Sequence, residues 1–110
     1  MRQYQIDDLR LEDHEKLAKW LEENYEPAGM DGVYWVPLAP HLLTEEQLAH
    51  KECHPLCFSI VLGENRLAGE LLVRTRKKMT CTCMGYATEA QRNWLVHLID
   101  GMLGELSIIN

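Results

Sequence analysis

Apolar positions recur with the period of an α-helix in two stretches of the chain. In the first, Leu17, Ala18 and Leu21 fall on one face and charged residues on the other, beginning near Glu12. Pro27 is expected to end this helix. The second stretch runs from about residue 89 to residue 106, and its apolar stripe is wide enough to cover a sheet: Trp94, Leu95, Leu98, Ile99, Met102, Leu103 and Leu106.

Two capping boxes mark where helices begin. Thr44 and Gln47 have the Thr-x-x-Gln spacing in which each side chain bonds the other residue's backbone N–H. They predict a short helix over residues 45–52, which Pro55 would end. Thr88 and Gln91 repeat the spacing at the start of the final helix.

Alternating residues predict strands in the remaining segments. Residues 4–6 are expected to form a short N-terminal strand, and residues 57–62, 67–75 and 79–86 a three-stranded antiparallel meander. Residues 33–36 are expected to form an edge strand or an extended segment because Pro37 and Pro40 follow. The predicted fold is a single α+β domain over residues 1–110, with a small antiparallel sheet packed on one face by two or three helices.

The face of the sheet turned away from the helices is too apolar to be stable in water. It is expected to carry Val61, Leu72 and Met84 among charged and polar neighbours. We expect residues 28–43 or a second copy of the chain to cover it, and we predict a homodimer.

Composition restricts the classes of partner. The chain has 110 residues, 17 acidic and 11 basic, and a net charge of −6, which disfavours binding to nucleic acid or to an anionic membrane. No apolar run approaches the ~20 residues of a membrane helix, and no signal segment begins the chain. We therefore expect a cytoplasmic protein whose four cysteines are reduced.

The cysteines and nearby histidines leave three interpretations open. The residues concerned are His50, Cys53, His54, Cys57, Cys81 and Cys83. Thiolate and imidazole are ligands that zinc prefers, but the spacings Cys-x-x-x-Cys and Cys-x-Cys differ from the usual Cys-x-x-Cys. We expect Cys81 and Cys83 to be buried core residues on a strand, so no cofactor or metal is predicted. Metal binding through Cys53, Cys57, Cys81 and Cys83, or a regulatory thiol, is the alternative.

Arg74 and Arg76 lie two residues apart on a predicted strand, so both side chains would project from one face. With Tyr34 and Trp35 from the irregular segment, they are candidates for binding an anionic ligand. The competing interpretation is a charged hairpin tip that blocks strand-to-strand aggregation.

No residue pattern indicates catalysis. A recognisable nucleophile motif and a glycine-rich phosphate loop are both absent from the sequence, so no catalytic residues are predicted. The favoured hypothesis is a non-enzymatic interaction or regulatory module that self-associates, with an unknown protein as a further partner. The alternatives are a protein or enzyme that binds a small anionic molecule, and a Cys/His metal-binding or thiol-redox protein.

Overall fold

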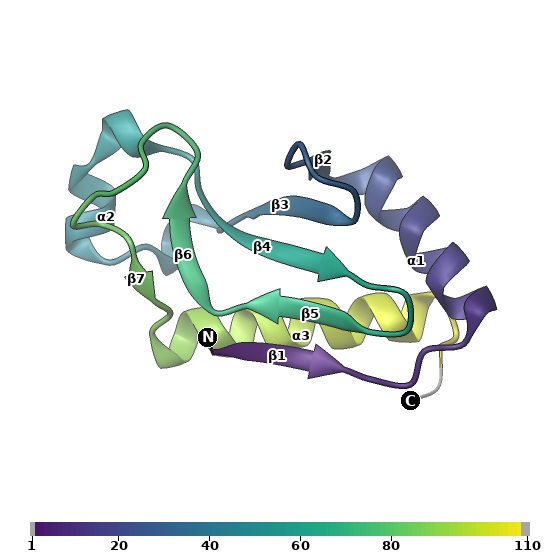
Figure 1. Ribbon diagram of the computed structural model, residues 1–110. Coiled ribbons are helices and arrows are strands. Elements are labelled where there is room, and N and C mark those ends of the chain that lie inside the picture. The colour runs from purple at the N-terminus through teal and green to yellow at the C-terminus, as the bar shows by residue number, and fades with distance from the viewer. Residues whose placement is uncertain (1, 109–110) are drawn as a thin grey trace.

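The computed structural model describes residues 2–108 and shows an α+β fold with one largely antiparallel sheet and helices against it (Figure 1). The strands are β1 (Gln3–Ile6), β2 (Glu26–Pro27), β3 (Val33–Pro37), β4 (Leu56–Leu62), β5 (Leu67–Glu70), β6 (Leu72–Thr75) and β7 (Gly85–Tyr86). The α-helices are α1 (Leu11–Asn24), α2 (Glu45–Ala49) and α3 (Glu89–Glu105), and two short 3-10 helices are η1 (Pro40–Leu42) and η2 (Lys51–Cys53). The predicted fold class is confirmed.

The sheet has the order β1-β5-β4-β3-β2, and every pair is antiparallel. β6 pairs with the beginning of β4, where Cys57 lies opposite Arg74, and β7 pairs with β6. Residues 67–75, predicted as one strand, therefore form two strands: β5 pairs with β1 and with the end of β4, and β6 pairs with β7 and with the beginning of β4. The short β6–β7 extension directs the chain toward α2 at one end of the molecule (Figure 1).

β3 is a strand inside the sheet, where the sequence predicted an edge strand or a packed extended segment. It lies between β2 and β4, with Tyr34 opposite Ile60 and Val36 opposite Phe58. Pro37 is the last residue of the strand, where a missing N–H costs little. Residues 33–37 thus extend the sheet, while Ala28 and Met30 line a cavity over its other face together with Trp35 and Val61.

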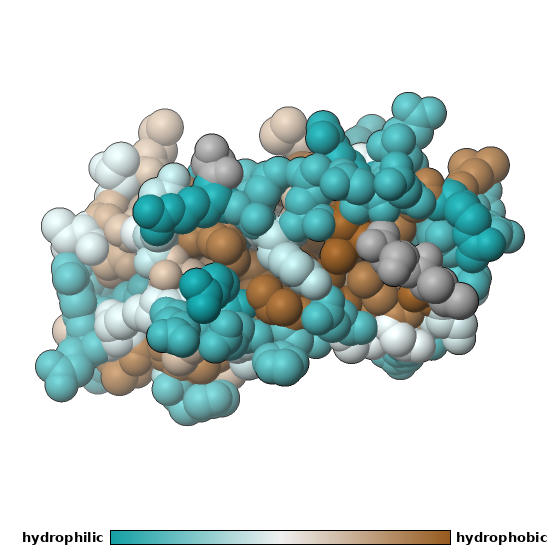
Figure 2. Space-filling view, turned by 90° about the horizontal axis from the view of Figure 1, so that it is seen from below, coloured by the Kyte–Doolittle hydropathy of each residue, from teal (hydrophilic) through white to brown (hydrophobic). Residues whose placement is uncertain are grey.

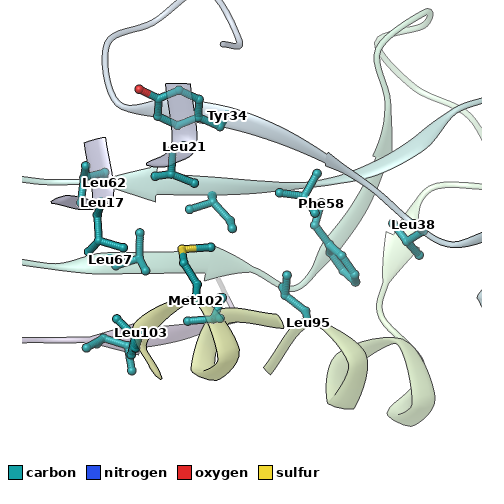
Figure 3. Packing of buried hydrophobic residues seen from close by; sticks show 14 of the residues in the cluster. Leu17, Leu21, Tyr34, Leu38, Phe58, Leu62, Leu67, Leu95, Met102 and Leu103 are labelled. Atoms are coloured by element: carbon teal, nitrogen blue, oxygen red, sulfur yellow. The ribbon is translucent and has the colours of Figure 1, made fainter. Parts of the chain in front are cut away.

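The core lies between one face of the sheet, the inner face, and the helices α1 and α3 (Figure 3). Phe58 and Leu67 come from the sheet, and Leu17 and Leu95 from the helices, and all four are completely buried. Gly69 lets α3 approach β5 closely, since a Cβ atom there would lie 2.7 Å from the Ile99 Cδ1 atom. This burial supplies most of the stability of a domain of this size.

The other face of the sheet, the outer face, carries Val33, Trp35, Ser59, Val61, Glu70 and Arg74, as the register of β3, β4, β5 and β6 requires. No helix among residues 2–108 packs on this face (Figure 1). Seen from the side of β1 and α3, hydrophilic and hydrophobic areas are interspersed on the surface (Figure 2). Within the same residues, none of the helices has the length and apolarity that crossing a membrane requires.

Candidate metal centre

Four metal-ligating side chains meet at the end of the molecule where α2 and the β6–β7 connection lie. The ligand atoms of His50, Cys53, Cys81 and Cys83 all lie within 4.8 Å of one another. The Sγ atoms of Cys53 and Cys81 are 3.7 Å apart, and Nδ1 of His50 is 3.1 Å from Sγ of Cys81. Tetrahedral zinc with Zn–S bonds of about 2.3 Å requires sulfur atoms roughly 3.8 Å apart. The donor types and their separations therefore fit a Cys₃His zinc site.

His50 and Cys53 are brought together by a single helical turn. His50 ends α2, and η2 follows directly, with the Cys53 N–H donating to the His50 carbonyl at 2.9 Å. Three residues of separation in such a turn place both side chains on the same side. The Thr75 hydroxyl donates to the Cys53 carbonyl at 2.6 Å and so ties η2 to the end of β6.

Cys81 and Cys83 lie in the connection between β6 and β7, which is not a strand. The Met84 N–H donates to the Cys81 carbonyl at 3.0 Å, which closes a turn around the two cysteines. The predicted strand over residues 79–86 is therefore wrong except for Gly85 and Tyr86. In a strand, residues 81 and 83 would share one face of the sheet, whereas the turn directs both thiols at His50 and Cys53.

Hydrogen bonds from buried glutamines hold the ligand segments in place. Gln47 donates its side-chain amide to the Cys83 carbonyl at 3.3 Å, and Gln91 donates to Gln47 Oε1 at 2.9 Å and to the Leu42 carbonyl at 2.9 Å. Both glutamines are buried, and both also close the capping boxes of α2 and α3. The sequence identified them as caps, but their link to Cys83 became visible only in three dimensions.

The second ring nitrogen of His50 faces a carboxylate. Its Nε2 atom lies 4.0 Å from Oε2 of Glu46, one helical turn earlier. Metal-binding histidines commonly direct their other nitrogen to such a group, which fixes the ring and makes the ligating nitrogen more basic. Glu46 was not among the residues that sequence reasoning selected.

The pKa values of Cys81 and Cys83 are shifted in opposite directions. Hydrogen bonds from the backbone N–H and the thiol of Cys83 lower the pKa of Cys81 to about 6. Burial, and then the neighbouring sulfurs of Cys81 and Cys53, raise the pKa of Cys83 to about 12. The cluster thus holds one thiolate that is stabilised by a proton on its neighbour. A divalent cation would take the place of that proton and stabilise both sulfurs as thiolates.

Two of the candidate ligands lie outside the cluster. Cys57 is on the outer face of β4, where burial raises the pKa of its thiol to about 11, and its Sγ atom contacts the Pro55 carbonyl at 3.7 Å. Nε2 of His54 lies 2.8 Å from the Gln47 carbonyl. The four-cysteine version of the predicted metal site is therefore wrong, and His50 takes the place of Cys57.

The residues proposed from sequence for an anionic ligand do not all meet. Trp35, Arg74 and Arg76 lie together, with the Arg76 guanidinium carbon 5.6 Å from the centre of the Trp35 ring. Tyr34 lies on the inner face and donates its hydroxyl to Glu22. Both arginines already face carboxylates, since Arg74 lies 3.8 Å from Glu70 and Arg76 pairs with Glu26.

Of the three residues predicted to form an interface, two lie on the outer face of the sheet and one does not. Val61 and Leu72 are half-buried on the outer side of their strands. Met84 follows Cys83 in the β6–β7 connection and packs against the core.

Comparison of the chain with protein-family models, curated proteins and solved structures yields no match.

Proposed function

We propose that this chain is a small non-enzymatic domain that holds one Zn²⁺ ion as a structural centre. The ligands are Nδ1 of His50 and the Sγ atoms of Cys53, Cys81 and Cys83. The convergence of these four atoms within 4.8 Å carries the proposal. Four protein ligands fill the tetrahedral coordination of zinc, which is typical of structural sites, whereas catalytic sites keep one position for water.

The fold has a segment that such a centre would stabilise. Residues 76–84 form no helix or strand, and they include Met79, which is 94% exposed. Its apolar contacts with the core come from Cys81, Cys83 and Met84, close to its C-terminal end, so the position of the connection depends strongly on these residues. A metal ion that links it to η2 would fix the connection against α2.

Metal content tests the proposal directly. Protein prepared without chelator should contain one zinc per chain by elemental analysis and native mass spectrometry, and Cys53→Ala and Cys83→Ala should lose it. Cys57→Ala is the matched control, because it removes a buried cysteine outside the cluster and should retain one zinc. Failure to bind zinc after reconstitution of reduced wild-type protein would contradict the proposal. Equal zinc content in wild type and in Cys83→Ala would also contradict it.

Cobalt substitution tests the geometry of the centre. Co²⁺ in a tetrahedral thiolate site gives intense visible bands and a sulfur-to-cobalt charge-transfer band, which Cys57→Ala should keep and Cys81→Ser should weaken.

Proton release on metal binding tests ligation by Cys83. Because the pKa of Cys83 is about 12, metal binding at neutral pH must release its proton. Calorimetry in buffers of different ionisation enthalpy should therefore detect at least one proton released, and a result independent of buffer would argue against thiolate ligation by Cys83.

The outer face supports a second candidate function, self-association of the chain. Val33, Trp35 and Val61 are only half-buried there, and the Nε atom of Arg74 is buried without a hydrogen-bond partner among residues 2–108. Glu70 and Arg74 lie side by side on this face. In two copies related by a two-fold axis, Glu70 of each copy would face Arg74 of the other, so the charges would be complementary. The proposed occupant of this face is a second copy of the chain.

Native mass measurement tests self-association. Wild type should have twice the mass of the chain, and Val61→Lys should have the mass of one chain because it places an unpaired charge in the contact. Leu11→Lys is the matched control, since Leu11 is 74% exposed on α1. A wild-type monomer at concentrations well above those used for purification would refute this second candidate.

A further inference from the structure

A cavity of about 500 Å³ lies beside the beginning of α3, on a part of the molecule that contains no metal ligand. Its lining consists of Arg2, Gln3, Leu71, Tyr86, Ala87 and Arg92. Figure 1 shows the N-terminus, β7 and the beginning of α3 next to one another at this place. Backbone hydrogen bonds from the Leu71 N–H to the Arg2 carbonyl (3.0 Å) and from the Ala87 N–H to the Leu71 carbonyl (2.8 Å) hold these segments together.

The lining is positively charged in an otherwise acidic chain. Arg2 and Arg92 are its only charged members, and it includes no carboxylate among the residues described. Three of the other four arginines, Arg10, Arg74 and Arg76, each face a carboxylate within 4.0 Å, and the fourth, Arg66, lies in a different cavity that also contains Glu70. Arg2 and Arg92 have no such ion pair within residues 2–108. The cavity thus combines two uncompensated guanidinium groups in a chain of net charge −6.

The two arginines keep most of their hydrogen-bond donors available. The guanidinium carbon of Arg2 lies 4.8 Å from the centre of the Tyr86 ring, a cation–π contact that uses the face of the group. The N–H groups point outward in the plane of the guanidinium, so this stacking restrains Arg2 while leaving its donors free. Arg92 makes one long bond, from Nη2 to Asn93 Oδ1 at 3.4 Å.

We propose that this cavity binds the phosphate group of a small phosphate monoester. Two guanidinium forks match the charge of a phosphate dianion, and each can donate two parallel hydrogen bonds to a pair of its oxygens. Leu71, Ala87 and the Tyr86 ring form an apolar wall for the organic part of the ligand. A volume of about 500 Å³ is typical of sites for small molecules. The cavity and the proposed zinc centre share no residue, so either proposal can fail alone.

Calorimetric titration of the full chain, at constant ionic strength, tests this site with two probes, inorganic phosphate and phenyl phosphate. Both should bind saturably with one site per chain, and phenyl phosphate should bind more tightly because its ring contacts the apolar wall. Arg92→Gln should weaken binding of both probes roughly tenfold or more, the loss expected for a charge-assisted hydrogen-bonding group. Amide NMR signals of Tyr86 and Ala87 should shift during the titration.

Arg66→Gln is the matched control, because Arg66 is exposed, has no ion pair among the described residues, and lines a different cavity, which also contains Glu70. It should bind both probes as wild type does. Equal affinity for the two probes would contradict a monoester site, because the apolar wall would then contribute nothing to binding. Absence of saturable binding, or equal losses in Arg92→Gln and Arg66→Gln, would overturn the proposal. Unchanged circular dichroism of both variants checks that they are folded.

Discussion

Removal of the metal from the proposed zinc centre should destabilise the fold by several kcal/mol. The centre would join Cys53 to Cys81, which are 28 residues apart in the chain. The loop-entropy relation for a crosslink closing a segment of that length gives about 3.6 kcal/mol at 25 °C. The total stability of a small domain is about 5–15 kcal/mol, so this is a large part of it. With a shift of about 4–8 °C for each kcal/mol, the melting temperature should fall by roughly 15–30 °C.

Differential scanning calorimetry on matched samples measures this effect. The reduced protein is scanned as prepared, after removal of metal with a chelator, and after addition of one equivalent of Zn²⁺. Cys57→Ala should show the same chelator effect as wild type, because Cys57 lies on the outer face and outside the cluster. Cys81→Ser should melt at the lower temperature with or without chelator. If zinc-loaded and chelated wild-type protein melt at the same temperature, the crosslinking argument is wrong.

Three further predictions concern the fold. Gly69→Ala should destabilise the protein by about 1–3 kcal/mol, because the new methyl group would press on Ile99 in a filled core. Gly101→Ala, on an exposed position of α3 with no atom near the added methyl group, should instead stabilise it by up to about 1 kcal/mol, and urea unfolding distinguishes the two signs. Hydrogen bonds from Arg10 lower the pKa of Asp13 below its ordinary value of 3.8. The interaction of Asp13 with Arg10 therefore stabilises the fold fully above pH 3.8, and this stabilisation is lost as the pH falls through the lower pKa of the folded state. In that range the unfolding free energy of Asp13→Asn should depend less on pH than that of wild type. Identical acid profiles for wild type and Asp13→Asn would contradict this role.

Local sequence signals predicted the helices well. The Thr88–Gln91 capping box and the apolar stripe placed a helix at residues 89–106, and α3 spans Glu89–Glu105. The Thr44–Gln47 box placed a helix at residues 45–52, which the structure divides into α2 and η2. These signals work because a cap and a helical face depend on residues within a few positions of one another.

The predictions of strands were less accurate than those of helices. Cys81 and Cys83 alternate with threonines, which is typical of a strand, but these residues form a turn between β6 and β7. The prolines after residue 36 favoured an edge strand, and the structure has β3 inside the sheet because Pro37 occupies its last position. The alternation of residues along the sequence predicts neither the turn at Cys81 and Cys83 nor the interior position of β3.

By itself, the sequence determined the α+β class, the positions of the helices and the presence of a soft set of metal-ligating residues. Only the tertiary structure decided which of those residues meet. Nδ1 of His50 and Sγ of Cys81 come from positions 31 residues apart, and their contact depends on the pairing of β6 with β4 and on the hydrogen bonds of Gln47 and Gln91. Cys57 is closer to His50 in sequence, yet it lies on the outer face because β4 begins before it and side chains alternate along a strand. Periodicity sets which side of its own element a residue occupies, whereas the packing of elements sets which residues become neighbours.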